Sequence, residues 1–436
     1  MSVVRVIGAG LAGCEAACAL AGRGHQVLLY EQKPVHFSPA HKSEQFAELV
    51  CSNSFKANRV ESAAGLMKEE MRRLGSVCLR VADTCTVPAG GALAVDRDLF
   101  STGVTRLVGE TDGITVIREE FTDLDDSMPT IVATGPLTEG KLAERLAAMT
   151  GSDALYFFDA AAPIVTADSL DYSKLFCQSR YDRGGDDYWN APFDKAGYEA
   201  FHHELVNAET AELHSFEEDQ PVYEGCMPIE KLAKRGLDAA RYGPMKPVGL
   251  RNPMTGHRPW AAVQLRKEDA EGSMFNLVGF QTNLKFGEQK RVFSMIPGLE
   301  NAEFVRYGVM HRNSFLNAPK VLDGTLRVSG TKQVYIAGQL SGVEGYMESA
   351  AGGLLAAYFL DSRLRGKEPA ALPEETMLGS LMRYLRQENK DFQPMGANMG
   401  ILPPVGEIKD KKERYAAYAK RALNALDAWL EKEYRE

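Results

Sequence analysis

A glycine-rich turn near the N-terminus constrains the fold of this chain more than any other feature. Residues 8–13 read Gly-Ala-Gly-Leu-Ala-Gly and match the pattern GxGxxG. The β-branched segment Val3–Ile7 predicts a buried parallel strand before the turn, and the alanine-rich segment after it predicts a helix over residues 11–23. A second strand is expected at Gln26–Tyr30 and is followed by Glu31. Strand, turn, helix, strand and acidic residue in this order predict a dinucleotide-binding fold.

Each glycine of the turn has a physical task in such a fold. Gly8 permits the tight turn, Gly10 lets the backbone approach a pyrophosphate, and Gly13 allows the helix to pack closely on the strand. The free N–H groups and the positive dipole end of the helix then face the phosphates. The acidic residue is placed to accept hydrogen bonds from the adenosine ribose. The expected cofactor contacts from this region are Gly8, Ala9, Gly10, Leu11, Ala12, Gly13 and Glu31.

Two later strand ends favour FAD over NAD as the bound dinucleotide. Residues 130–135 read as a strand ending in Ala-Thr-Gly, and residues 334–339 read as a strand ending in Ala-Gly-Gln. Both resemble the returning strands of flavoproteins with two dinucleotide folds, in which such ends contact the cofactor. Glycines then lead into a helix of small residues, expected over 349–359, whose N-terminus can approach the flavin or the pyrophosphate. The expected contacts are Thr134, Gly135, Gly338, Gln339, Gly345 and Tyr346.

The order of these segments predicts an α/β protein with two domains. A doubly wound, Rossmann-like FAD-binding domain opens the chain, and its last strand returns only near residue 334. We therefore assign residues 1–150 and 304–436 to a discontinuous FAD-binding domain. Residues 151–303 then form a smaller inserted α/β domain on the substrate side. Two further helices are expected near the C-terminus, at about residues 374–388 and 411–433.

Composition places the chain among ordinary globular proteins of the cytoplasm. The 436 residues are 44% hydrophobic and 25% charged, and no apolar run reaches the length of about 18 residues that a membrane span needs. The seven cysteines show no CxxC spacing, and the N-terminus lacks the pattern of a signal peptide. Reduced thiols in the cytoplasm are therefore expected rather than a disulfide framework.

A basic stretch at residues 227–267 stands out because the net charge of the chain is −9. It carries nine Lys and Arg residues against two acidic residues, and it also holds Tyr242, His257 and Trp260. Cations pair with phosphates and aromatic rings stack on extruded bases, so this stretch favours a surface that faces RNA. A solvated helix face is the alternative explanation for any run of charges.

Two cysteines occupy positions that suit chemistry. Cys226 lies just before an expected helix start, marked by Pro228 and Glu230, with several cations following in sequence. A helix N-terminus and nearby cations both lower the pKa of a thiol. Cys51 lies in a polar loop early in the cofactor domain, where flavin-facing loops arise. A buried, inert thiol is the alternative for both, and it is the expectation for Cys14 and Cys18.

Six segments resemble the bacterial folate- and FAD-dependent tRNA (uracil-5-)-methyltransferases, and the resemblance spans nearly the whole chain. The cysteine-centred motifs and the histidine-containing segment are specific to this family rather than to flavoproteins at large. The matching segments are GAGLAGCEAA at 8–17, LVCSNSFKAN at 49–58, YEGCMPIE at 223–230, YGVMHRNSF at 307–315, AGQLSGVEGYMESAA at 337–351 and FQPM at 392–395.

The resemblance implies a mechanism with two cysteines and three small molecules. It assigns to Cys226 the addition to C6 of uracil, which makes C5 nucleophilic, and it places Cys51 beside the flavin. His311 matches the histidine that stacks on the folate pterin; a core histidine is the alternative. It further implies 5,10-methylenetetrahydrofolate as carbon donor, NAD(P)H as reductant and tRNA as partner, with the T-loop uridine at position 54 as the target, which must be extruded before reaction.

Three alternatives remain open at this level. A related flavoprotein that builds aminomethyl groups on wobble uridines shares the AGQ…GY pattern, but it is longer. A second relative methylates a uridine in ribosomal RNA with the same cofactors. An NAD(P)H-dependent flavin oxidoreductase without an RNA substrate is the third, and the basic stretch and the wide separation of the two cysteines argue against it.

Overall fold

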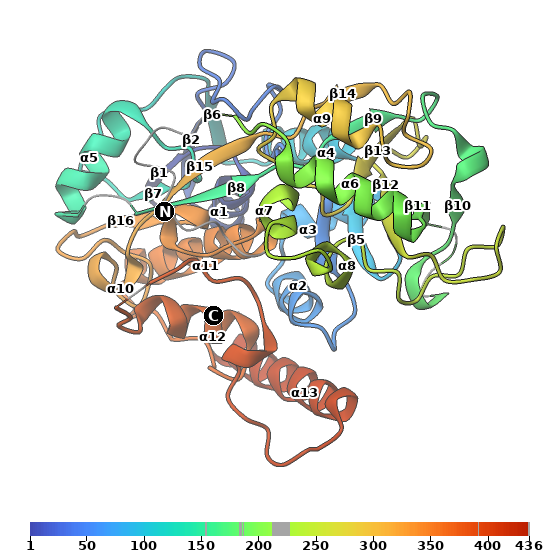
Figure 1. Ribbon diagram of the computed structural model, residues 1–436. Coiled ribbons are helices and arrows are strands. Elements are labelled where there is room, and N and C mark those ends of the chain that lie inside the picture. Colours follow the sequence, from blue (N-terminus) through green and yellow to red (C-terminus); the bar gives the residue numbers. More distant parts are fainter. Residues whose placement is uncertain (153–154, 183–184, 186, 212–226, 391, 435–436) are drawn as a thin grey trace.

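The first layer of the protein is a five-stranded parallel sheet (Figure 1). The computed structural model describes residues 1–152, 155–182, 185, 187–211, 227–390 and 392–434. The strands lie in the order β16, β7, β1, β2 and β6, and every neighbouring pair is parallel. This confirms the predicted doubly wound α/β fold. In that order the strands are Val334–Ile336, Thr130–Val132, Val3–Ile7, Gln26–Tyr30 and Ile114–Ile117.

Two helices built largely from small residues pack against each other and against this sheet (Figure 1). They are α1, Leu11–Gly22, and α11, Tyr346–Leu364. A methyl group at Gly353 would lie 2.0 Å from the carbonyl oxygen of Ala12, so only glycine permits the observed approach. Helix α11 begins earlier than expected, directly after Gly345, whose φ is +121°.

Further elements of the N-terminal part of the chain pack on the same core. A three-stranded antiparallel sheet follows β2, with three helices beside it, and α5 follows β7. A buried carboxylate joins these parts, because Glu15 on α1 accepts hydrogen bonds from the backbone N–H groups of Val77 (3.0 Å) and Cys78 (3.1 Å) at the start of α3. Burial raises the pKa of Glu15 to about 7. These elements are β3 Ser54–Ala57, α2 Ala63–Arg73, α3 Val77–Ala82, β4 Thr86–Val87, β5 Ala92–Val95, α4 Arg97–Gly109 and α5 Gly140–Thr150.

A second sheet of six strands, all paired in antiparallel fashion, has its own hydrophobic core. It lies at the right of Figure 1 with four helices and ends with β14, just beyond the boundary expected at residue 303. Its strands, in spatial order, are β10 Phe176–Cys177, β11 Tyr188–Phe193, β12 Ala261–Lys267, β13 Met274–Leu277, β9 Ile164–Thr166 and β14 Phe304–Arg306. Its helices are α6 Lys195–Asn207, α7 Ile229–Ala233, α8 Ala239–Tyr242 and α9 Phe286–Phe293.

A two-stranded antiparallel ladder connects the two halves. It pairs β8, Leu155–Ala160, with β15, Met310–Phe315. Beyond it the chain adds α10, Ala318–Val321, and the two C-terminal helices that the sequence predicts, α12 at Met377–Arg386 and α13 at Lys411–Trp429. Short 3-10 helices lie at Tyr172–Lys174, Arg180–Asp182, Gly338–Ser341 and Met399–Ile401, and a π-helical turn at Leu430–Tyr434.

The described part of the chain contains neither a membrane-spanning helix nor a metal-binding cluster. None of its helices combines the length and the apolar character that crossing a membrane requires. It likewise contains no group of three or more His, Cys, Asp or Glu side chains placed to hold a metal ion.

Candidate functional site

The glycine turn between β1 and α1 has the geometry that its sequence predicts. Gly8 has a φ of +96°, and a methyl group there would lie 2.7 Å from the carbonyl oxygen of Ala133. A methyl group at Gly13 would lie 1.8 Å from the carbonyl oxygen of Gly8, whereas one at Gly10 would meet no protein atom within 4 Å. Gly8 and Gly13 are therefore required by packing, and the open side of Gly10 leaves room for a ligand to approach the backbone.

The turn opens into a cavity of about 510 Å³, within the range of roughly 300–1,000 Å³ that is usual for ligand sites. Glu31 is buried at its wall and accepts hydrogen bonds from the backbone N–H groups of Ala9 (2.9 Å) and Lys33 (3.0 Å). This ties the acidic residue to the glycine turn. The predicted cofactor residues that line the cavity are Gly8, Ala9, Gly10, Leu11, Ala12, Glu31, Thr134, Gly135, Gly338, Gln339 and Tyr346.

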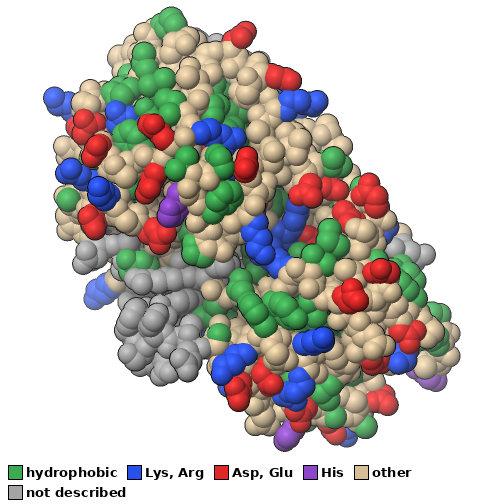
Figure 2. All heavy atoms as spheres, turned by 90° about the horizontal axis from the view of Figure 1, so that it is seen from above, with side chains coloured by type: hydrophobic (Ala, Val, Ile, Leu, Met, Phe, Trp, Pro, Cys, Tyr) green, Lys and Arg blue, Asp and Glu red, His purple; other side chains and the backbone are tan. Residues whose placement is uncertain are grey.

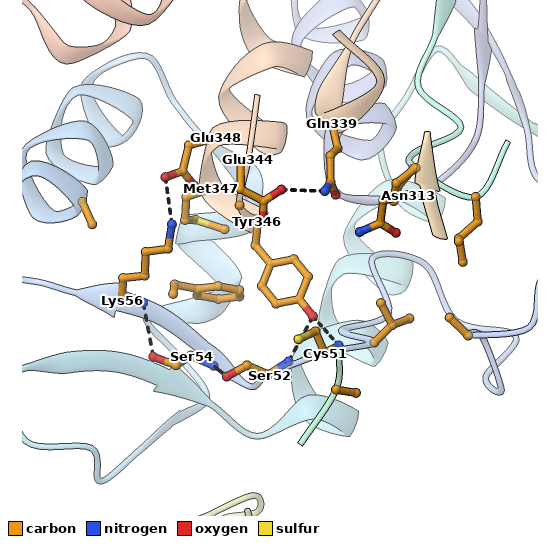
Figure 3. Close-up of a pocket in the computed structure, with 18 of the residues that line it drawn as sticks. Cys51, Ser52, Ser54, Lys56, Asn313, Gln339, Glu344, Tyr346, Met347 and Glu348 are labelled. Atoms are coloured by element: carbon orange, nitrogen blue, oxygen red, sulfur yellow. Dashed lines mark hydrogen bonds and ion pairs between the residues drawn. The ribbon is translucent and has the colours of Figure 1, made fainter. Parts of the chain in front are cut away.

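A second, smaller cavity of about 150 Å³ adjoins the first and contains Cys51 (Figure 3). Gly345 lines this second cavity and not the first. The two cavities share part of their walls, because some residues line both of them. The shared residues are Val50, Pro136, Leu137, Gln339 and Tyr346. A dinucleotide bound along the first cavity would thus place one end beside Cys51.

The phenol of Tyr346 holds the Cys51 loop. Its oxygen accepts hydrogen bonds from the backbone N–H groups of Cys51 (2.6 Å) and Ser52 (3.3 Å), as Figure 3 shows. Burial, together with the neighbouring Cys51 side chain, raises the pKa of Tyr346 above its usual range. The phenol therefore keeps its proton near neutral pH, and with two N–H groups already bound to its oxygen it has that proton to donate.

Two arginines hold the same loop from the other side. The Arg97 guanidinium donates to the carbonyl oxygens of Leu49 and Cys51, the latter at 3.1 Å, and forms an ion pair with the buried carboxylate of Glu268. Arg306 on β14 donates to the carbonyl oxygen of Val50. Both cations therefore act on the backbone on either side of the thiol.

A third arginine corrects the interpretation of the basic stretch. Arg266 belongs to that stretch in sequence but is buried on β12, only 6% exposed. Its guanidinium donates to the side-chain oxygen of Asn53 (3.0 Å) and to the Ser52 hydroxyl (2.9 Å). Arg266 supports the Cys51 loop and is not available to contact RNA, because its guanidinium is buried against that loop.

Other members of the basic stretch differ in exposure and in how tightly they are held. Arg251 and Arg258 are exposed and Lys246 is half-buried. Arg241 packs over the ring of Trp260 at 3.8 Å and forms an ion pair with Asp238. Figure 2 shows Lys and Arg side chains along the hollow between the two lobes of the molecule.

Two predicted residues fall partly or wholly outside what the structure describes. Cys226 lies outside the described residues. The helix expected after it is present as α7, and its first residues are anchored, since Ile229 donates its backbone N–H to Gln281 (2.7 Å) and the buried Glu230 accepts from Asn283 (2.9 Å). His311 lies on β15 opposite Asp159, and its side chain is outside the described part.

Comparison with known proteins identifies the family. The family model of glucose inhibited division protein A matches residues 3–368. The protein named methylenetetrahydrofolate–tRNA-(uracil-5-)-methyltransferase TrmFO from Acetivibrio thermocellus is 54% identical, over 98% of this chain and 99% of its own length. The TrmFO protein of Bacillus subtilis is 53% identical, over 97% of each chain. The chain belongs to the TrmFO family.

Solved structures agree with this at the level of the fold. The Aquifex aeolicus GidA structure in its form II crystal matches with a TM-score of 0.70 at 16% identity, covering 98% of this chain and 73% of that one. The form I crystal of the same protein gives a TM-score of 0.69 at 15% identity. The family relationship rests on the sequences, and the architecture is shared with GidA.

Several residues of the site were not expected from the sequence. The arginines Arg97 and Arg306 lie far from Cys51 in sequence and reach it only through the tertiary fold. Asn313 also lines the Cys51 cavity. It lies within the TrmFO-like segment YGVMHRNSF, of which only His311 was expected at the site. Polar residues within that specific motif were the signal that could have found it.

Proposed function

We propose that this chain methylates C5 of a uridine in tRNA, with 5,10-methylenetetrahydrofolate as carbon donor and FAD as bound cofactor. The relatives named for this reaction share more than half of their residues with the chain over nearly its full length. The structural observation that carries the proposal is the junction of the two cavities. A half-buried thiol, Cys51, lies where a dinucleotide seated on the glycine turn would end.

The finer assignment concerns the target and the reductant. We infer that the substrate is the T-loop uridine at position 54, giving 5-methyluridine, and that NAD(P)H supplies the electrons in the cytoplasm. Support for an RNA substrate comes from the exposed cations Arg251 and Arg258 of the basic stretch, because phosphates provide most of the affinity for nucleic acid. The choice of the T-loop rests on the resemblance to the family.

Different residues would bind the different parts of the two cofactors. The backbone of residues 8–13 would hold the pyrophosphate at the N-terminus of α1, and Glu31 would bind the adenosine ribose. FAD, when bound, supplies the electron transfer that no side chain can perform during conversion of the one-carbon unit to a methyl group. The folate pterin would stack on His311.

The cysteines supply the nucleophile and a second thiol. Carbon C5 of uracil becomes nucleophilic when a thiolate adds to C6, and Cys226 has this role in the proposal. The target base must leave the RNA stack to reach it. Cys51 serves either the transfer of the methylene group or the removal of the C5 proton. Tyr346, with its retained proton, and Arg97, bonded to the Cys51 carbonyl, hold that thiol in place.

Nucleoside mass spectrometry tests the proposal. Unmodified tRNA and a ribosomal RNA fragment are each incubated with the holoenzyme, methylenetetrahydrofolate and NAD(P)H, and 5-methyluridine is mapped in both. The expected result is 5-methyluridine at position 54 of tRNA and none in the ribosomal fragment. Methylation of the ribosomal fragment alone would change the substrate, and NAD(P)H oxidation without folate and without an RNA product would favour a simple flavin oxidoreductase.

A further inference from the structure

The Cys51 cavity contains a buried side-chain amide without a partner. Asn313, on β15, is only 5% exposed and lines the cavity. Its amide makes no hydrogen bond to any residue that the structure describes, and Figure 3 shows the amide directed into the open space. The amide opens onto the cavity and bonds to no described residue, so its donors and its acceptor are available to a molecule bound there.

The other polar groups around this cavity are already engaged. The Gln339 amide donates to the Glu344 carboxylate at 2.7 Å. Lys56 pairs with Glu348 at 3.2 Å, and the Tyr346 oxygen accepts two backbone N–H groups. Asn313 is thus the one side-chain amide lining this cavity, among the described residues, with both its donors and its acceptor available.

The position of Asn313 identifies which part of a ligand it meets. The next residue, Ser314, donates its backbone N–H to the carbonyl oxygen of Pro136 at 2.7 Å, and Leu316 donates to that of Leu340 at 2.8 Å. Pro136 lines both cavities, and Leu340 lies in the turn that carries Gln339. Strand β15 and the residue after it are therefore hydrogen-bonded to both returning loops of the dinucleotide fold, and Asn313 lines the cavity together with Pro136 and Gln339 of those loops.

We propose that Asn313 recognises the imide edge of the flavin ring of FAD. An amide side chain offers N–H donors beside a carbonyl acceptor, and it can meet an adjacent donor and acceptor at once, as Asn does on adenine. The pyrimidine part of the flavin presents such an edge, with C4=O beside N3–H. The Asn313 N–H donates to C4=O and the Asn313 carbonyl accepts from N3–H. This inference rests on the proposed function, which assigns FAD to the adjoining cavities.

A target uracil carries the same imide chemistry, so the test must separate the two sources. The flavin is favoured because the loops on both sides of Asn313 also line the dinucleotide cavity. A donor to C4=O stabilises the extra electron density of the reduced flavin. Its loss should therefore weaken FAD binding and also make the flavin harder to reduce, in the absence of any RNA.

The experiment uses Asn313→Leu and Asn313→Asp, with Asn317→Leu as the matched control. Asn317 is a buried asparagine on the same segment, with an unpaired side-chain oxygen, and it lines neither cavity. Without RNA or folate, FAD affinity is measured by reconstitution of the apoprotein and reduction is followed against redox dyes. Asn313→Asp keeps the size of the side chain, which guards against a failure to fold.

Both Asn313 variants are expected to bind FAD about tenfold more weakly and to hold a flavin that is harder to reduce, while the control behaves as the wild type. Wild-type FAD affinity and reduction behaviour in both Asn313 variants would overturn the inference. An increase confined to the KM for tRNA would overturn it too, since the imide recognised would then be the uracil. If the wild-type protein binds no FAD, the proposed function fails together with the inference.

Discussion

The two adjoining cavities are built in different ways. The dinucleotide cavity is lined by the glycine turn and by the ends of neighbouring strands, and its shape depends on Gly8, whose replacement would drive a methyl group into the carbonyl oxygen of Ala133. The Cys51 cavity is formed from side chains that come from distant parts of the chain, and its loop is held by Arg97 on helix α4 and by Arg266 and Arg306 of the second sheet. The centre of the first is a local turn motif, whereas the second depends on contacts between the first part of the chain and the second sheet.

The largest expected effect is at Gly13. Gly13→Ala would place a methyl group 1.8 Å from the Gly8 carbonyl oxygen, and such overpacking costs about 3 kcal/mol, so both stability and FAD binding should be lost. Gly10→Ala is the control, because its methyl group points into open space and should weaken FAD binding while leaving the Tm of the apoprotein near that of the wild type. Equal Tm values for the two apo-variants would contradict the assignment of Gly13 to packing and of Gly10 to ligand approach.

Cys51→Ala should abolish chemistry without removing the cofactor. We expect methylation to fall by about 100-fold or more, with the flavin absorbance of the purified protein unchanged, because the loop backbone is held by Tyr346 and Arg97 rather than by the thiol. Cys177→Ala, in the second sheet, is the control and should keep full turnover. Wild-type methylation by Cys51→Ala would remove the thiol from the mechanism.

Three cations of the basic stretch give a smaller, salt-dependent effect. Replacing Lys246, Arg251 and Arg258 together by Gln should weaken tRNA binding about tenfold at low salt and reduce the salt slope by up to about three. Arg241 is left in place because its packing on Trp260 also serves the fold. Neutralising Lys141 and Arg145 on α5, at the opposite end of the molecule in Figure 1, should not change binding. A salt slope equal to that of the wild type in the triple variant would place the RNA elsewhere.

The smallest effect concerns Lys68, which hydrogen-bonds to the backbone beside the Cys51 cavity. Lys68 on α2 is fully buried and donates to the carbonyl oxygens of Phe55 and Ala57, both at 2.7 Å, and Phe55 lines the cavity. Burial lowers the pKa of Lys68 from 10.5 to about 7. Between these two pH values the unfolded chain binds the proton and the folded chain does not, so the stability contributed by Lys68 rises with pH across this window.

Thermal unfolding of the wild type and Lys68→Met at several pH values checks this sign. The lost hydrogen bonds should cost about 1–2 kcal/mol. The Tm difference in favour of the wild type should be larger at about pH 9.5 than at about pH 6.5, because the stability contributed by Lys68 rises between these two pH values. A difference that shrinks as the pH rises would show that the folded protein retains the proton.

The comparison of cavities also explains what the sequence could predict. The strands β1, β2, β7 and β16 and the tasks of Gly8 and Gly13 follow from local pattern, and the structure confirms them. Residues that act through tertiary contacts were beyond such reasoning. Arg266 is the clearest case, because the charge count placed it on an RNA-facing surface whereas β12 carries it into contact with Asn53.

The role of Arg97 could not be predicted from the sequence for a related reason. It begins an ordinary amphipathic helix, and only the fold brings it to the carbonyl oxygen of Cys51. Buried charges of this kind become visible when their partners are known, since a buried charge needs hydrogen-bond or ion-pair partners such as the Glu268 carboxylate. The family motif around Cys51 marked the loop but not the cations that support it.

The position of the flavin ring in the holoenzyme tests the central claim most directly. A crystal structure of the protein with FAD should show the pyrophosphate on the turn of residues 8–13 and the ring in the second cavity, beside Cys51. A flavin ring located outside that cavity, with the Cys51 side chain remote from it, would contradict the account of two cavities acting as one site.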